Sequence, residues 1–190
     1  GVSFQNYGSN GSRNWRIRPD DQSRWGDLDF SVSPTANSAT DWPDAASDKV
    51  LTLGYDGTVT KPRQPYFKAN LSSGVRITGT GYVVFGSAVH NNGSHYNTSD
   101  GKFTAPVTGL YWFSSRINAY DRIDFQIRVN GSEVERGQYN TDNDQVGWWS
   151  NQLTTITYMT AGQYAQVYVT NLDQNTDPDL WCTFMGYLIC

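Results

Sequence analysis

Aspartate side chains crowd two polar stretches of this 190-residue chain. Asp173, Asp177 and Asp179 lie in NLDQNTDPDLW, and Asp142 and Asp144 lie in NTDND. Carboxylate oxygens in such loops are the hard ligands that Ca²⁺ prefers. Asp173, Asp177 and Asp179 are therefore a candidate calcium site, although neither stretch has the glycine and glutamate spacing of an EF-hand. Aspartates that only form solvated turns are the simpler alternative.

Large aromatic side chains stand close to these stretches in the sequence. Trp148 and Trp149 are adjacent in QVGWWSNQ, and Trp181 follows the second aspartate stretch. Aromatic rings with amides and carboxylates nearby suit sugar recognition, because sugars present apolar C–H faces and hydroxyl groups. Adjacent residues of a strand point to opposite faces, so we expect one of Trp148 and Trp149 in the core and the other outward or at a subunit boundary. His90 and His95 match no standard metal-site spacing, and surface histidines are the simpler interpretation.

The sequence carries no catalytic motif. A nucleophile elbow, a zinc-protease helix motif and a phosphate loop are all absent from it. Two acidic residues that could act together in sugar hydrolysis can be chosen from the sequence. Aspartates occur in most of its turns, however, so such a pair carries little information. We therefore expect a protein that is not an enzyme. A depolymerase is the alternative, and it would release reducing ends from polysaccharide.

The composition indicates a loop-rich β protein with an aromatic core. Aromatic residues make up 14% of the chain and charged residues 17%. Glutamate, the acid that favours helices, occurs only at Glu133 and Glu135. The net charge of −4 argues against a nucleic-acid partner, because phosphate binding needs concentrated Lys and Arg. No apolar run approaches membrane-spanning length. No signal peptide is visible, and we expect the native chain to extend before Gly1.

The two cysteines, Cys182 and Cys190, flank a stretch that is typical of a strand. Eight residues of strand span roughly 26 Å at about 3.3 Å per residue. A disulfide needs Cα atoms within about 7 Å, so we expect no bond between this pair. Buried thiols and an intermolecular bond both remain open as their role.

Two prolines in KPRQP predict a boundary between a segment, residues 1–62, and a domain, residues 63–190. In the first segment, WGDLDFSVS alternates and places Leu28, Phe30 and Val32 on one face. KVLTLGYDGTVT carries the DG signal of a hairpin. So few large apolar side chains make a poor independent core. We expect this segment to borrow burial from the second domain or from copies of itself.

The second segment reads as many short strands with turn residues between them, which is typical of a sandwich or barrel. The clearest hairpin is RIDFQIRVNGSEV, with the turn at Asn130-Gly131. Its alternation sets the apolar side chains inward and Asp124, Gln126 and Arg128 toward solvent. YWFSSRINAY and QYAQVYVTN alternate in the same way.

The order and spacing of several motifs from Tyr66 to Cys190 resemble the C1q-like domain, a ten-stranded jelly roll related to the tumour necrosis factor fold. The motifs are PYFKA, SHYNTSDG, the run from KFTAP to YWF, TAGQYAQVYV and the closing TFMGYLI. The residues that the resemblance makes structural are Phe67, Phe85, Phe103, Gly109, Tyr111, Phe113, Phe184 and Gly186. The chain departs from the family in lacking a preceding collagen-like Gly-x-y repeat.

The resemblance implies an all-β, C1q/TNF-like jelly-roll sandwich that forms a homotrimer. Pro106 and Gly109 would then turn the corner between strands of different sheets, where proline leaves the ladder and glycine starts the next strand tightly. The aromatic residues after them would fill the core and the trimer axis. Some members of the family bind calcium near the apex of the trimer. The resemblance therefore supports the aspartate loops as candidate calcium sites.

The first segment has a different likeness. WRIRPDDQSRWGDLDFSVS and VLTLGYDGTVTKP are similar to stretches that precede C-terminal modules of bacteriophage tail fibres. Together the two likenesses predict the trimeric, receptor-binding tip of a viral tail fibre, located in the virion, that attaches to a host surface receptor of carbohydrate type. A secreted C1q-like recognition lectin and a purely structural trimerisation module are the alternatives.

Long polar loops on a rigid scaffold commonly carry binding, and we expect the loops at the free end of the trimer to meet the host. The loops HNNGSHYNTSDG, NTDND and DQNTDPD are the candidates. The ligand-binding residues expected from them are His95, Tyr96, Asp142, Asp144, Asp177 and Trp181.

Overall fold

The computed structural model describes residues 1–5, 11–19, 26–38, 40–43, 45–120, 122–137, 147–172 and 181–190. The chain separates into two compact units, unit 1 (Gly1–Gln64) and unit 2 (Pro65–Cys190). Within the described ranges, the secondary structure consists of strands and one 3₁₀ turn, η1 (Ala46–Asp48). The all-β prediction is confirmed.

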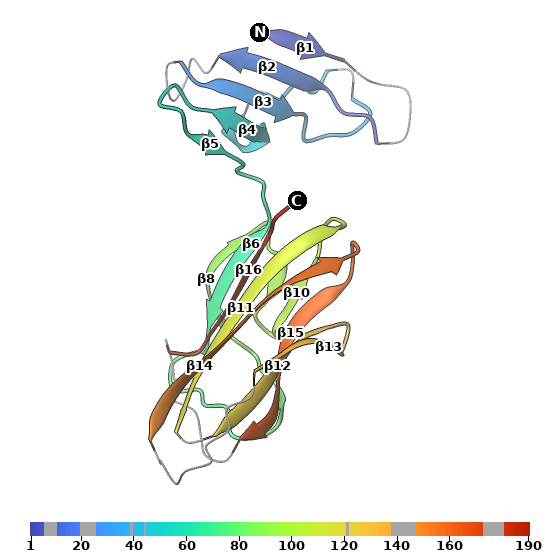
Figure 1. Ribbon diagram of the computed structural model, residues 1–190. Coiled ribbons are helices and arrows are strands. Elements are labelled where there is room, and N and C mark those ends of the chain that lie inside the picture. Colours follow the sequence, from blue (N-terminus) through green and yellow to red (C-terminus); the bar gives the residue numbers. More distant parts are fainter. Residues whose placement is uncertain are drawn as a thin grey trace. The chain divides into compact units, whose positions relative to one another are not determined.

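Unit 1 is one antiparallel sheet of five strands in sequence order (Figure 1). The strands are β1 (Val2–Phe4), β2 (Trp15–Pro19), β3 (Leu28–Val32), β4 (Lys49–Leu53) and β5 (Val59–Thr60). The predicted hairpin joins β4 to β5, and Gly57 adopts a φ of +84° in its turn. Its backbone N–H donates to the Gly54 carbonyl at 3.0 Å, which closes the turn.

One face of the unit 1 sheet is polar and covered. Asp29 has no solvent exposure; its carboxylate forms an ion pair with Lys49 Nζ at 2.7 Å and accepts a hydrogen bond from Thr52 Oγ1 at 2.6 Å. The loop between β3 and β4 lies over this face. Trp42 of this loop stacks on the Arg16 guanidinium, whose central carbon is 5.5 Å from the centre of the ring. Unit 1 therefore organises its covered side by ion pairs and hydrogen bonds, and the buried hydrophobic cluster of the protein lies elsewhere.

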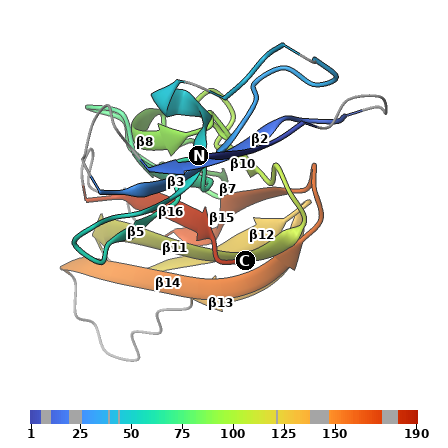
Figure 2. The ribbon, with the colours of Figure 1, turned by 90° about the horizontal axis from the view of Figure 1, so that it is seen from above.

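Unit 2 is a sandwich of two antiparallel sheets (Figure 1). The five-stranded sheet runs in the order β14 (Trp148–Met159), β11 (Gly109–Tyr120), β16 (Thr183–Leu188), β6 (Tyr66–Asn70), β8 (Ser87–Asn92). The six-stranded sheet runs in the order β13 (Ser132–Gly137), β12 (Ile123–Val129), β15 (Tyr164–Leu172), β10 (Lys102–Thr104), β9 (Tyr96–Asn97), and β7 (Gly81–Tyr82) also pairs with β15. The long edge strand β14 runs beside β11 in Figure 2.

The core of unit 2 is aromatic. The Phe67 ring stacks on Phe103 at 4.9 Å and meets Phe184 edge-on at 5.0 Å, which are favourable ring geometries. Phe103 contacts Phe113 at 5.6 Å, so residues from both sheets form one cluster. The buried positions include the residues that the family resemblance makes structural, namely Phe67, Phe85, Phe103, Gly109, Tyr111, Phe113, Phe184 and Gly186.

The corner at Pro106 and Gly109 connects the two sheets. It joins β10 of the six-stranded sheet to β11 of the five-stranded sheet, as predicted. A Cβ on Gly109 would lie well inside the van der Waals contact distance of the Cys190 carbonyl oxygen and 2.9 Å from Leu188 Cδ1. Glycine is required here because the last strand passes directly over the start of β11.

The hairpin of β12 and β13 forms around Asn130-Gly131, and both turn residues have positive φ, as a two-residue hairpin turn demands. The two cysteines do not bond each other: Cys182 is a buried free thiol and Cys190 an exposed one. The expectation that this pair cannot bridge is confirmed.

Strand register defines two ends of unit 2. The entry end holds Tyr66, where the chain arrives from unit 1, with Leu188 and Gly109 nearby. The far end holds Tyr120 and Trp148, which pair at the opposite end of β11 and β14. These two names are kept below.

Candidate functional site

The outward face of the five-stranded sheet is divided into an apolar half and a polar half. Toward the entry end, the register aligns Ile156, Trp112, Tyr187 and Tyr66 in one row across four strands. The Trp112 and Tyr187 rings lie 5.3 Å apart. Ile156 is 60% exposed, and Tyr66 and Tyr187 are also exposed. An ordered row of large apolar side chains in water marks a contact surface.

Toward the far end, the same face becomes polar and hollow. A depression of about 570 Å³ is lined by Arg116, Asn118, Trp148, Ser150 and Trp181. Asn118 pairs with Ser150 across β11 and β14, which sets both side chains on the outward face. We call these five residues the far-end pocket.

Two tryptophans frame the far-end pocket. Trp148 is 51% exposed and Trp181 is 59% exposed, although each offers a large apolar ring. The Trp148 ring is supported by an edge contact with Tyr120 at 5.4 Å. Arg116 Nε donates to the Trp181 carbonyl at 3.2 Å, which links β11 to the backbone two residues before β16.

The pocket combines three kinds of recognition chemistry. Its indole rings can cover the apolar face of a ligand. Asn118 and Ser150 offer an amide and a hydroxyl, which both donate and accept hydrogen bonds. The Arg116 guanidinium carries further N–H donors in a planar fork that matches a carboxylate. A hydroxyl-rich ligand with an apolar face fits this set, and a negative charge on the ligand would add to it.

Of the ligand-binding residues expected from the sequence, Trp181 lines this pocket. His95 lies elsewhere: it follows β8, which reaches the entry end where Asn92 pairs with Tyr66. His95 is half-buried with its ring 6.5 Å from Phe103, and burial lowers the pKa of its imidazole. Asp142, Asp144 and Asp177 lie outside the described residues.

Tyr96 requires a correction, because it is 2% exposed and belongs to the core. Its ring stacks on Phe67 at 4.6 Å, and its hydroxyl donates to the Phe85 carbonyl at 3.1 Å. Burial raises the pKa of the Tyr96 hydroxyl well above its ordinary value. Tyr96 therefore fixes the wall of the sandwich and cannot reach a surface ligand.

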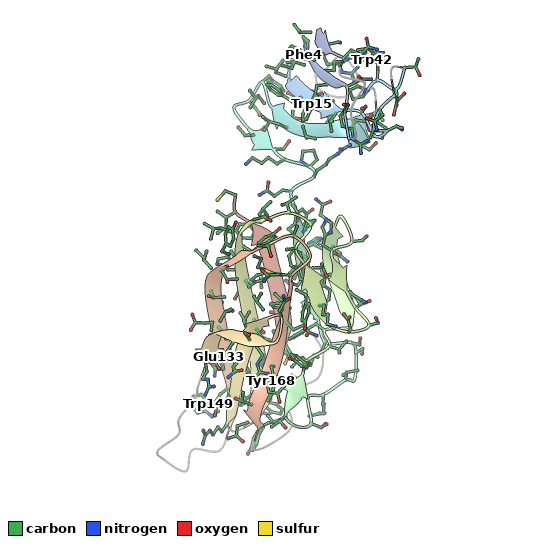
Figure 3. All side chains as sticks on the ribbon, turned by 90° about the vertical axis from the view of Figure 1, so that its right-hand side faces the viewer. Phe4, Trp15, Trp42, Glu133, Trp149 and Tyr168 are labelled. Atoms are coloured by element: carbon green, nitrogen blue, oxygen red, sulfur yellow. The ribbon has the colours of Figure 1, made fainter. Side chains whose placement is uncertain are left out.

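The tryptophan pair in β14 also differs from expectation. Trp148 and Trp149 do point to opposite faces, but both are exposed, so neither fills the core. They stand at the first two positions of the strand, beyond the reach of the aromatic cluster. Figure 3 places Trp149 at the far end of unit 2.

No group of three or more His, Cys, Asp or Glu side chains within the described ranges could hold a metal ion. The candidate calcium ligands Asp173, Asp177 and Asp179 lie outside those ranges. His90 pairs with Lys68 in the sheet register and contacts the Tyr66 ring at 6.4 Å.

The outward face of the six-stranded sheet holds a second correction. Asp124 and Gln126 point away from the core, as predicted, yet both are buried. Arg128 packs beside Gln126: its guanidinium is 3.6 Å from the centre of the Tyr168 ring, and its Nε donates to Gln126 Oε1 at 2.7 Å. Gln126 Nε2 in turn donates to Glu133 (Figure 3 labels Glu133 and Tyr168). Long side chains thus cover this face.

Two ion pairs lie on that face. Arg136 donates to Glu133 at 2.6 Å, and this hydrogen bond lowers the pKa of the Glu133 carboxyl. Arg122 pairs with Asp124 at 2.7 Å. These ion pairs and hydrogen bonds distinguish the face from the far-end pocket with its exposed indole rings.

Three residues of the pocket were missed in the sequence. Arg116 and Asn118 occupy outward positions of β11, whose pattern indicated only its inward side chains, and Ser150 follows the tryptophan pair of β14. The signal was present as polar residues at every second position of SSRINAY, opposite the apolar ones. Their meeting with Trp148 depends on the β11–β14 register, which no local pattern reveals.

The chain matches the C1q domain over residues 66–189. A complement C1q subcomponent chain from Rattus norvegicus is 35% identical over 77 residues, which cover 40% of this chain. The chain spans about a quarter of the length of that curated relative, because the match covers 27% of it.

Solved structures with a similar fold include the globular domain of zebrafish complement 1qA protein. It has a TM-score of 0.54 at 15% identity and covers 67% of this chain and 98% of its own. Eiger TNF from S. frugiperda has a TM-score of 0.52 at 10% identity, covering 67% and 94%. Murine APRIL has a TM-score of 0.51 at 12% identity, covering 66% and 98%. The C1q domain match covers about two thirds of the chain, and the sandwich topology and aromatic core of unit 2 agree with it. This chain therefore belongs to the C1q domain family.

Proposed function

We propose that this chain is the homotrimeric, non-enzymatic, receptor-binding tip of a viral tail fibre, and that it attaches to a glycan on the host cell surface. The observation that carries the proposal is the far-end pocket, where the exposed rings of Trp148 and Trp181 stand beside the half-buried Arg116. It lies at the end of unit 2 opposite Tyr66, through which the rest of the chain connects. C1q and TNF-like domains are commonly trimeric recognition modules, which fits this use.

The apolar half of the five-stranded sheet supports the trimer part of the proposal. Ile156, Tyr158 and Tyr187 hold large apolar surfaces in water on a single chain, which is unfavourable by about 25 cal/mol for each Å². Three copies packed face to face around an axis would remove that surface from water. Interfaces of this obligate kind are large and resemble a core cut in half.

The tail-fibre part of the proposal draws on unit 1. Its sequence is similar to stretches that precede fibre tips, and its apolar side chains are at most half-buried in one chain. A slender segment that completes itself in an assembly suits a fibre shaft. On this proposal the protein is located in the virion.

The ligand is proposed to be a sugar that packs one face against an indole ring and presents hydroxyls to Asn118 and Ser150. Each such contact contributes about 1–2 kcal/mol, which is weak for a single pocket. Three pockets on one trimer would convert weak contacts into strong attachment to a cell surface. A sugar carboxylate would find Arg116 within the same depression.

The test is binding of the purified full chain to a glycan array and to host cells, with and without calcium. Trp148→Ala and Trp181→Ala should each weaken binding about tenfold, while sedimentation still shows a trimer. Tyr55→Ala is the matched control, because Tyr55 is an exposed aromatic residue of unit 1. Binding that survives both tryptophan changes would place the receptor site elsewhere. Loss of binding on calcium removal would point instead to the aspartate stretches.

A secreted recognition lectin is the second candidate, because the curated relative that matches is a complement protein. A lectin would have the same trimer and the same pocket as the tail-fibre tip. The two functions differ in the source of the glycan that the pocket binds. A trimer that binds nothing on cells or arrays would leave only a structural trimerisation module.

A further inference from the structure

The second face of the unit 1 sheet is apolar at every position that the strand register brings together. Val2 pairs with Ile17, which pairs with Phe30 and then Leu51. Residues directly opposite in an antiparallel ladder share a face, so each such row is continuous. The complete face holds Val2, Phe4, Trp15, Ile17, Leu28, Phe30, Val32, Leu51, Leu53 and Val59.

This apolar face is open in the single chain. Phe4 is 53% exposed and Val59 is 61% exposed, and Trp15 and Leu28 are exposed as well. Among the described residues, the buried hydrophobic side chains all lie between Phe67 and Phe184, in unit 2. An antiparallel sheet with one solvated face normally turns its polar side to water. Unit 1 does the reverse, since its polar face lies under the β3–β4 loop.

We propose that this face packs against the same face of two further copies of the chain, so that unit 1 is a second self-association element beside unit 2. The inference rests on the trimer proposed above for unit 2. Only a few residues, 61–65, separate β5 from β6, so a unit 2 trimer would hold three unit 1 sheets at millimolar effective concentration or above.

The charge pattern favours copies over a different partner. The rows contain no Asp, Glu, Lys or Arg, so identical faces meet without like-charge repulsion. The same absence leaves nothing on the face to attract a charged macromolecule. The charged groups of the sheet lie on the other side, where Asp29 pairs with Lys49. Closed cyclic symmetry with one repeated patch is the usual outcome for such a surface.

The experiment uses neighbouring residues of β5. Val59 lies on the apolar face and Thr60 on the polar face, and both are exposed in one chain. Val59→Cys and Thr60→Cys are each made in the full chain with Cys190→Ser, which removes the exposed native thiol. Leu28→Cys is a second probe nearer the middle of the face. The readout is the rate of alkylation by a small maleimide, followed by mass spectrometry.

In the assembled chain, alkylation at Val59→Cys and Leu28→Cys should be at least tenfold slower than at Thr60→Cys. The protection should vanish when Ile156→Asp and Tyr187→Asp separate the copies through unit 2. Equal rates at positions 59 and 60 in the assembled chain would overturn the proposal. Protection that persists in the separated chain would also overturn it, since the cover would then come from the same chain.

Sedimentation of the parent chain keeps this result distinct from the proposed function. A trimer with an open apolar face contradicts only the inference about unit 1. A monomer contradicts the unit 2 trimer directly. Glycan binding is read separately, because the far-end pocket contains none of the probed positions.

Discussion

The two units of this chain are both antiparallel β-structures, yet they cover opposite kinds of side chain. Unit 2 encloses aromatic residues such as Phe67 and Phe103 between two sheets. Unit 1 encloses Asp29 and its partners under a loop and leaves its apolar face open. Alternation along a strand determines which residues share a face. Which face becomes buried depends on the element that packs against the sheet. In unit 1 that element is the β3–β4 loop, and it covers the polar face.

The largest expected effect is in the aromatic core. Phe103→Ala should cost about 3–5 kcal/mol of unfolding free energy, because the Phe103 ring contacts both Phe67 and Phe113 and leaves a cavity behind. Denaturant titration of the unit 2 transition measures it. Tyr55→Ala in unit 1 is the control and should change stability by less than about 0.5 kcal/mol. A loss below about 1 kcal/mol at Phe103 would mean that unit 2 is loosely packed.

The matching experiment in unit 1 removes a charge. Lys49→Met leaves the Asp29 carboxylate buried with only Thr52 as a partner, which should cost about 3–5 kcal/mol. Hydrogen exchange of the amides in β3 and β4 should rise sharply while unit 2 is unchanged. Adding Asp29→Leu should restore protection, because no unpaired charge remains. If the single and double variants behave alike, the ion pair is not what organises the covered face.

The sequence predicted much of unit 2 because its signals are local. In unit 2, the NG turn, the corner at Pro106 and Gly109, and the apolar alternation of β12 and β15 all formed as expected, as did the DG turn of unit 1. The C1q-like resemblance supplied the expectation of a jelly-roll sandwich. Interpretation failed where a side chain reaches across strands: the Arg128 guanidinium stacks on the Tyr168 ring of the neighbouring β15, and no pattern along β12 contains that contact.

The candidate site was less predictable than the fold. Trp181 was predicted because a tryptophan directly after a polar, aspartate-rich stretch can be recognised in the sequence. Arg116 and Asn118 were missed, since their role depends on which residues β14 places opposite them. Tyr96 was misassigned because its strand has only two residues, too few for alternation to show which way its ring points.

A smaller effect is expected at the corner between the sheets of unit 2. Gly109→Val should cost about 1–3 kcal/mol by overpacking, because its Cβ would press on the Cys190 carbonyl and Leu188. The yield of soluble trimer should fall with it. Gly147→Val is the control, where an added Cβ meets nothing closer than Trp149 Nε1 at 3.6 Å. An unchanged melting temperature for Gly109→Val would show that the last strand can move aside.

The smallest effect is a pH dependence that separates the units, since both histidines lie in unit 2. Burial lowers the pKa of His95 below its ordinary value of 6.5, so the unfolded chain takes up the proton more readily. Unit 2 should therefore lose stability as the pH falls through about 6.5. Melting at pH 7.5 and 5.5 measures the shift, and His95→Gln should reduce it. A shift of the same size in His95→Gln would assign it to other groups.

The entry end of unit 2 holds both ends of its polypeptide. Leu188 donates its backbone N–H to the Pro65 carbonyl at 3.0 Å, and Tyr187 pairs with Tyr66, so the first and last strands are direct neighbours (Figure 1). Chain ends that meet in this way tolerate relinking and fusion. Cargo joined after Cys190 would emerge beside the incoming linker and leave the far-end pocket clear. Unit 2 therefore has the arrangement of a display scaffold: a fused partner would be attached at the entry end, and the far-end pocket would stay accessible at the other end.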